Sequence, residues 1–378
     1  MVASSSAKIT KGAKSMQIDQ KKISFVAILL SLPFITLATP GLTQQNSLNF
    51  ISEVKGDVKI QRSGRNNSQK AYGGEILNSS DSLRLGQGAS TKVVCNNLSI
   101  WNIKSPGEFS VSSGCPSTGK PVLIRNGSNR APTRAPNDPT IPYIISPRDT
   151  AILSDKPTLR WNAVEGATSY KVTLRGPGVN WTTNVKQSEV VYSGQEPLQP
   201  GSRYRVIVTA DNGATSEREA PVGFTLLSEK DAKQVKAEIT QLQKQPLTNE
   251  SKTFALAYLY QSKNLNTEAI DLLTGLVKQR NQSTAVYQLL GSLYQQVGLH
   301  RLAKEHYLTA LKLANAEKNL EAQATIQASL GEINIVLDNL QQAFESLQAA
   351  QNSYLALGDE QQVQQLQQKI DDLKGRLP

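Results

Sequence analysis

YQLLGSLYQQVGLHRLAKEHYLTA, residues 287–310, is the stretch that decides the fold of the C-terminal third of this chain. Apolar residues recur in it every three or four positions, which is typical of amphipathic helices, and Gly298 divides it into two of them. Gly291 and Ala303 are small residues among large ones, and they would let the two helices approach closely. The stretch therefore predicts a tightly packed pair of helices.

The order of large and small residues in this pair resembles the tetratricopeptide (TPR) repeat. The residues that carry the resemblance are Tyr287, Leu290, Gly291, Tyr294, Ala303, Tyr307 and Ala310. The resemblance implies a stack of helix pairs with a concave face that binds a protein partner.

Two weaker copies of the pattern flank this pair. Ala269 stands 34 residues before Ala303, and Asn264 takes the place of the turn glycine in that copy. Ala343 stands 40 residues after Ala303, which extends the helices of that junction. Three repeats are about the minimum for a stable stack, so we predict an all-α TPR-like domain over 228–378.

Two further helices are expected beside the three pairs. Ser228 followed by Asp231 is a capping arrangement that would open a helix over 229–245. A polar stretch from Asp359 to Leu377 predicts a capping helix at the other end.

The first helix of each repeat would line the concave face. The resemblance places on it Phe254, Tyr258, Gln288, Ser292, Gln295, Ala328, Glu332 and Ile335. Phe254 and Tyr258 stand four positions apart, so they share a helical face, and an exposed pair would anchor a peptide or helix. The alternative is that both pack against the helix over 229–245.

A basic segment followed by an apolar run opens the chain. Five lysines precede the run over 23–38, which contains Pro33 and is shorter than the roughly 20 apolar residues of a spanning helix. We therefore predict a signal peptide over 1–38 and export to the periplasm or cell surface. An uncleaved membrane anchor is the alternative, and Met16 is an alternative start.

Residues 50–125 contain short strand-like runs separated by Gly, Asn, Ser and Asp turns, after a polar tether over 39–49. VKGDV at 54–58 and DSLRLG at 81–86, followed by Gly88, resemble the FecR-like domain of bacterial envelope proteins. The resemblance implies a twisted β-sheet module outside the cytoplasm.

The chain has two cysteines, Cys95 and Cys115, and both lie in this module. An isolated pair in an exported protein is expected to form a disulfide. A metal site would need more ligands, and a thioredoxin-like redox role would need a C-x-x-C motif.

The next segment, 143–227, contains KPTLRWNAVEGATSYKVTLRG at 156–176 and LQPGSRYRVIVTADN at 198–212. Their apolar spacing resembles a fibronectin type III-like sandwich. The resemblance implies that Trp161 and Tyr204 are core residues, with the tyrosine hydroxyl bonded near its turn.

These segments together predict a multidomain chain, in which two all-β modules precede an all-α TPR-like helical repeat domain. Residues 126–142 between the two modules carry four prolines and many small polar residues, which is typical of a semi-extended linker.

Charge and motifs exclude several function classes. The net charge is +10, but no basic stripe with interleaved aromatics indicates a nucleic-acid partner. His300 and His306 are six positions apart, about 240° round a helix, so they cannot share a metal ion. Catalytic serine, P-loop, zinc-protease and dinucleotide motifs are absent. We predict no enzyme, no cofactor and no metal.

Two functions fit these expectations. The first is a non-catalytic envelope scaffold or adaptor that binds a protein partner through the repeats. The second is a cell-surface protein that binds glycan or peptidoglycan through its β modules. A membrane contact is expected only if the signal peptide is not cleaved.

Overall fold

The structure, a computed structural model, describes residues 49–116, 138–218, 221–279 and 282–377. All of these residues belong to one unit, Thr43–Pro378. The predicted signal peptide, the tether before Asn49 and most of the Pro-rich linker lie outside the described residues. Among the helices that are described, none has the length and apolar character needed to cross a membrane.

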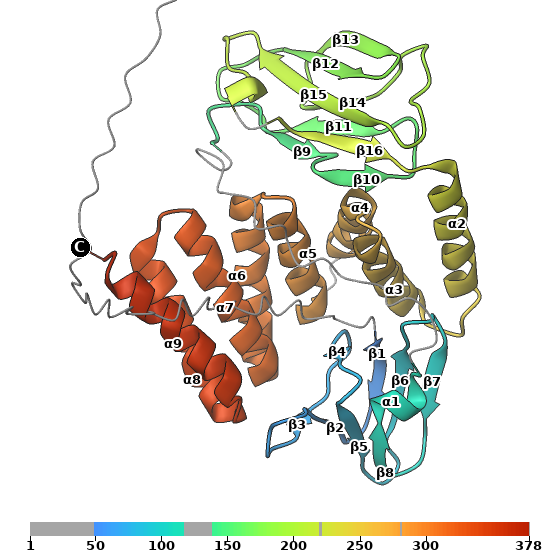
Figure 1. Ribbon diagram of the computed structural model, residues 1–378, viewed down its shortest axis with the longest axis vertical. Helices are drawn as coiled ribbons and strands as arrows, with labels where there is room; N and C mark the ends of the chain where they lie inside the picture. Colours follow the sequence, from blue (N-terminus) through green and yellow to red (C-terminus); the bar gives the residue numbers. More distant parts are fainter. Residues whose placement is uncertain (1–48, 117–137, 219–220, 280–281, 378) are drawn as a thin grey trace, which may run out of the picture. The chain divides into compact units, whose positions relative to one another are not determined.

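The first β region covers residues 49–116 and contains eight short strands and one helical turn (Figure 1). The elements are β1 (Asn49–Lys55), β2 (Val58–Gln61), β3 (Gln69–Lys70), β4 (Ile76–Leu77), β5 (Ser82–Leu85), β6 (Ser90–Val94), β7 (Ile100–Ile103), β8 (Gly107–Ser110) and α1 (Val111–Gly114). They form two antiparallel sheets, in the orders β4-β1-β6-β7 and β3-β2-β5-β8. In β2, Val58 and Ile60 are buried and Lys59 is exposed, so alternate residues supply the core. A disulfide joins Cys95 to Cys115, whose Cα atoms are 5.2 Å apart.

The second β region covers residues 138–226 apart from Glu219 and Ala220. Its elements are β9 (Ile144–Ser146), β10 (Thr150–Ile152), β11 (Thr158–Trp161), β12 (Tyr170–Gly176), β13 (Val179–Val185), β14 (Glu189–Val191), β15 (Arg203–Ala210), the 3₁₀ turn η1 (Ser216–Arg218) and β16 (Gly223–Leu226). A five-stranded sheet, β10-β16-β15-β12-β13, and a three-stranded sheet, β14-β11-β9, share one core. Trp161 and Tyr204 are buried in that core. The Tyr204 hydroxyl accepts a bond from the Gln199 amide at 2.6 Å.

The C-terminal part is an eight-helix TPR-like domain, which we call the repeat domain. Its helices are α2 (Glu229–Gln243), α3 (Asn249–Ser262), α4 (Asn266–Lys278), α5 (Thr284–Gln296), α6 (His300–Glu317), α7 (Leu320–Val336), α8 (Leu340–Leu357) and α9 (Glu360–Lys374). The predicted fold class, two all-β modules followed by an all-α repeat domain, is confirmed.

The helices pair as α3 with α4, α5 with α6 and α7 with α8. The turn between the two helices of each pair contains one residue in the left-handed backbone conformation. Asn264, Gly298 and Asp338 have φ angles of 59°, 78° and 59°. Asparagine and aspartate tolerate this conformation better than other residues that carry a Cβ atom. A turn can therefore form without glycine at Asn264 and Asp338.

Close approach within a pair depends on glycine. A Cβ atom on Gly291 would lie 2.8 Å from the Tyr307 ring, and a Cβ atom on Gly331 would lie 2.5 Å from Leu347. Ala303 and Ala343 are fully buried on the partner helices. The predicted role of these small residues in helix packing is confirmed.

Candidate functional site

A cavity of about 1210 Å³ lies between the first β region and the inner face of the repeat domain. We use "inner face" for the residues of α3, α5 and α7 that line this cavity. These are the first helices of the three pairs, which were expected to form the concave face. Residues of the second β region, Arg148 and Asp149 among them, complete the wall.

Four polar residues of α5 line the cavity in a single row: Thr284, Gln288, Ser292 and Gln295. They are spaced four, four and three positions apart, so they lie on one helical face. The Tyr307 hydroxyl of α6 donates to the Gln295 side-chain oxygen at 3.1 Å. Burial raises the pKa of Tyr307 to about 12, so its hydroxyl stays a donor at neutral pH. None of the four residues is ionisable, and three of them were predicted to face a partner.

The α7 part of the wall carries Thr325, Ser329 and Glu332. Glu332 was also predicted, and its carboxylate is ion-paired with Lys369 of α9. Ala328 and Ile335 were expected on this face, but they pack in the apolar cluster formed with α8 and α9. The cavity-facing side of α7 is therefore rotated relative to the expected one.

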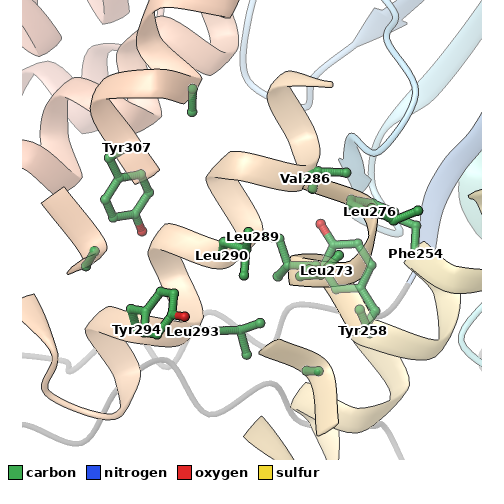
Figure 2. Packing of buried hydrophobic residues seen from close by; sticks show 14 of the residues in the cluster. Phe254, Tyr258, Leu273, Leu276, Val286, Leu289, Leu290, Leu293, Tyr294 and Tyr307 are labelled. Carbon is green, nitrogen blue, oxygen red and sulfur yellow. The ribbon is translucent and has the colours of Figure 1, made fainter. Parts of the chain in front are cut away.

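Phe254 and Tyr258 of α3 do not form an exposed anchor pair, although Tyr258 is among the residues that line the cavity. Each is only 6% exposed, and Phe50 of β1 covers both, with ring centroids 5.7 and 5.1 Å away. Leu242 of α2 belongs to the same apolar cluster, so the alternative of packing against that helix describes part of the contact. Figure 2 shows the pair beside the apolar side chains of α4 and α5. Burial of large apolar surface explains why the first β region covers them.

The loop before β4 lines the cavity and packs closely against α3 and α5. Gly74 has a φ of 89°, and a Cβ atom there would overlap the Cβ atom of Ala285 on α5. The Tyr258 hydroxyl donates to the Gly74 carbonyl at 3.3 Å. Only a glycine lets the backbone pass this close to the helices in this conformation.

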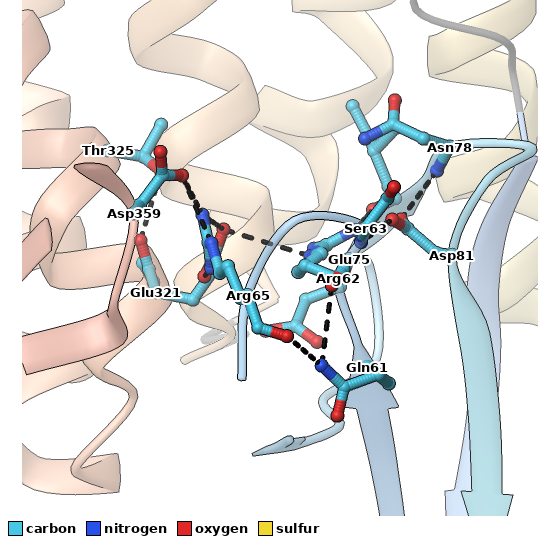
Figure 3. Close-up of polar contacts among 12 residues, drawn as sticks. Gln61, Arg62, Ser63, Arg65, Glu75, Asn78, Asp81, Glu321, Thr325 and Asp359 are labelled. Atoms are coloured by element: carbon cyan, nitrogen blue, oxygen red, sulfur yellow. Dashed lines mark hydrogen bonds and ion pairs between the residues drawn. The ribbon is translucent and has the colours of Figure 1, made fainter. Parts of the chain in front are cut away.

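An arginine clamp, formed by residues that also line the cavity, ties the first β region to α7 and α9 (Figure 3). Arg65, from the loop after β2, donates to Glu321 in the first turn of α7 and to Asp359, the N-cap of α9, with 2.6 Å to the Asp359 oxygen. Arg62 binds Asp81 at 2.7 Å and lies 3.8 Å from Glu321. The Arg65 side chain is 8% exposed, so the clamp lies largely outside solvent screening. The first β region thus spans the inner face from α3 to α9.

Glu75 lies beside this clamp and is an unusual acid. Burial raises its pKa to about 7, although the Arg62 guanidinium and the Tyr72 amide act in the opposite direction. A carboxyl group of this kind takes up a proton close to neutral pH.

The second β region is attached to the repeat domain by main-chain and ionic contacts. Arg148 donates to the Val297 carbonyl at the end of α5 at 2.8 Å. The Asn264 carbonyl accepts from the Ala151 amide at 2.8 Å. Arg160 pairs with Asp271 at 2.8 Å. This region therefore contacts the turn after α3, the middle of α4 and the end of α5.

The remaining chemically distinctive residues do not form a reactive cluster. His306 stacks on Tyr294, with centroids 5.1 Å apart, and burial lowers its pKa. His300 lines the cavity, and burial followed by the Arg148 charge lowers its pKa. Within the described ranges, no three His, Cys, Asp or Glu side chains are placed to hold a metal ion.

Sequence reasoning missed three residues that line the cavity, Thr284, Thr325 and Ser329. Thr284 stands four positions before Gln288, and Thr325 stands four positions before Ser329. The i, i+4 rule applied to Gln288 would have found Thr284. Arg65 left no such signal, because its partner Glu321 is 256 residues away in the sequence.

The comparisons with known proteins concern the helical part. No family model matches the chain, and no curated protein matches its sequence. BtubC from P. vanneervenii is 15% identical over 39% of this chain and 73% of its own, with a TM-score of 0.27. MamA AMB-1 is 17% identical over 39% and 87%, with a TM-score of 0.27. YrrB, described as a TPR protein with an unusual peptide-binding site, is 13% identical over 39% and 81%, with a TM-score of 0.25.

Proposed function

We propose that this chain is a non-catalytic scaffold or adaptor of the bacterial envelope, which binds a segment of a partner protein in the cavity between its repeat domain and its first β region. The observation that carries the proposal is the uncharged polar row of Thr284, Gln288, Ser292 and Gln295, which faces a cavity of about 1210 Å³. Helical repeat stacks present this inner surface to their partners.

The arrangement of charges favours binding over chemistry. Arg65, Glu321 and Asp359 are engaged with one another, so they hold the first β region in place. General acid–base catalysis needs a group free to exchange its proton with a substrate. The expectation that the chain is not an enzyme remains a prediction.

Export to the periplasm or cell surface is part of the proposal. It is supported by the basic segment and apolar run at the N-terminus and by the disulfide between Cys95 and Cys115. Disulfides persist in oxidising compartments and are rare in the cytosol.

A cavity-filling variant tests the binding role. The full chain is used as bait in a native envelope extract beside Gln288→Trp, which adds bulk inside the cavity. Leu308→Trp is the matched control, because Leu308 is 50% exposed on α6 and does not line the cavity. We expect the unmodified chain and the control to retain the same partner protein, and Gln288→Trp to lose it.

Equal retention by all three baits would contradict the proposal. Sedimentation of the full chain with purified cell wall, unaffected by Gln288→Trp, would instead favour polymer binding by the β regions.

A further inference from the structure

We infer that this chain forms a two-fold symmetric dimer, in which strand β13 (Val179–Val185) of one copy pairs antiparallel with β13 of a second copy. The five-stranded sheets of the two copies would then join into one continuous sheet across the two-fold axis. The inference goes beyond the proposed function, because it concerns the second β region and does not use the cavity.

Strand β13 is a long edge strand without the usual protection. It ends the order β10-β16-β15-β12-β13, and Figure 1 shows it at the rim of the second β region, beyond β12. It has seven residues, whereas the other edge strands of the described sheets have two to four. Proteins commonly protect a long edge with a proline, a charge or a bulge. The sequence of β13 contains no proline and no charged residue, and its pairing with β12 is regular throughout.

Alternate residues of β13 direct their main-chain groups away from β12. The hairpin closes on the pair Gly176 and Val179 across a two-residue turn, so this pair and every second pair after it exchange hydrogen bonds between the strands. Asn180, Thr182 and Asn184 lie between these pairs, and their N–H and C=O groups therefore point to the open edge. All three residues are exposed, and none of the described main-chain groups bonds to them on that side.

The sequence of β13 suits pairing with itself. VNWTTNV reads almost the same in both directions, with Thr182 at its centre. A two-fold axis beside Thr182 places this residue opposite its own copy. Asn180 then faces Asn184 of the second copy on one side of the sheet, and the strand ends Val179 and Val185 face each other on the other side. Each of the three pairs that involve open-edge residues would exchange two main-chain hydrogen bonds.

Charges near the strand do not oppose this pairing. Lys186, which follows β13, would face the uncharged Gly178 of the second copy. On the neighbouring strand, Lys171 of one copy and Arg175 of the other would lie three strand spacings apart, which is about 14 Å. This separation exceeds the Debye length of about 8 Å at physiological ionic strength, so their repulsion is largely screened.

Sedimentation velocity of the purified full chain tests the dimer. A single pair of short strands buries less area than a standard interface, so we expect a dissociation constant of about 1–100 μM and a dimer fraction that rises with concentration. Thr182→Lys places two like charges opposite each other at the axis and should leave only the monomer. Val191→Lys is the matched control and should dimerise normally, because Val191 is 51% exposed on edge strand β14 of the other sheet.

Added cysteines test the register. The two native cysteines are joined in a disulfide, so an introduced thiol has no competitor. Thr182→Cys should form an intermolecular disulfide on mild oxidation, because hydrogen-bonded partners on antiparallel strands have Cα atoms about 5.5 Å apart. Asn184→Cys alone should not, since its own copy lies four residues away, about 13 Å along the strand. A mixture of Asn180→Cys and Asn184→Cys should form the disulfide.

Three results would overturn the inference: a chain that stays monomeric up to about 300 μM, a dimer that Thr182→Lys leaves intact, or Asn184→Cys that cross-links as readily as Thr182→Cys. Circular dichroism checks that Thr182→Lys is folded, and the cysteine variants decide the question if it is not. Partner retention by the unmodified chain and its loss in Gln288→Trp are separate results, so the proposed function can stand if the dimer fails.

Discussion

Single glycines decide how closely the helices of this chain pack. Gly291 faces the buried ring of Tyr307, and an added Cβ atom would lie 2.8 Å from it. Gly275 lies inside α4 and has open space around it. The two residues therefore respond oppositely to the same substitution.

We expect Gly291→Ala to lower the free energy of unfolding by about 1–3 kcal/mol, because the tyrosine ring or the helix must shift. Gly275→Ala should raise it by about 0.5–1 kcal/mol, since alanine is the better helix former. Urea denaturation followed by circular dichroism measures both. A stabilised Gly291→Ala variant would contradict the packing described for α5 and α6.

The raised pKa of Glu75 predicts that the stability of the folded chain depends on pH. Its pKa is raised to about 7 in the folded chain from an ordinary value of 4.5, so the folded state holds a proton that the unfolded state has lost between these values. The contribution of Glu75 to stability is therefore fully present below pH 4.5, and it falls as the pH rises towards 7.

Glu75→Gln removes the loss of stability at higher pH, because glutamine stays neutral at every pH. The variant should be more stable than the unmodified chain at pH 8 by roughly 1–3 kcal/mol, and the difference should vanish near pH 4.5. Thermal unfolding across this range measures it, with the exposed Glu196→Gln as control. A gain of equal size at pH 4.5 and pH 8 would rule out the protonated carboxyl.

At the scale of elements, the arginine clamp joins three pieces that are distant in sequence. Arg65→Ala leaves Glu321 and Asp359 without their shared partner, and these carboxylates are only 19% and 18% exposed. We expect this substitution to lower the free energy of unfolding by roughly 2–4 kcal/mol and to speed up hydrogen exchange at the start of α9.

Arg84→Ala is the matched control for the clamp. Arg84 pairs with Glu108 on the exposed surface of the same β region, where ion pairs contribute little. An equal effect of the two substitutions would show that Arg65 does not tie the β region to the helices.

The helices and strands themselves were largely predictable from the sequence, but the contacts between the modules were not. The helix pairs followed from the spacing of Gly291 and Ala303, and the helix over 229–245 followed from the Ser228 cap, which accepts from the Asp231 amide in the structure. The covering of Phe254 by Phe50 and the Arg65 clamp depend on contacts between distant segments. No local period or propensity encodes such contacts.

At the scale of the molecule, the two β regions contact different helices and turns of the repeat domain. The first spans the inner face through Phe50 and Arg65, and the second holds the turns of α3 and α5 through Ala151 and Arg148. The predicted binding residues Gln288, Ser292, Gln295 and Glu332 all line the cavity. The proposed binding surface is therefore shared between modules.

Site-specific photo-cross-linking in living cells tests the central claim most directly. A photo-reactive diazirine amino acid of about the size of leucine replaces Ser292 inside the cavity, or Leu355, which is 65% exposed on α8 outside it. The account predicts a covalent adduct with one partner protein from position 292 and none from position 355. No adduct from position 292, or the same adducts from both positions, would contradict it.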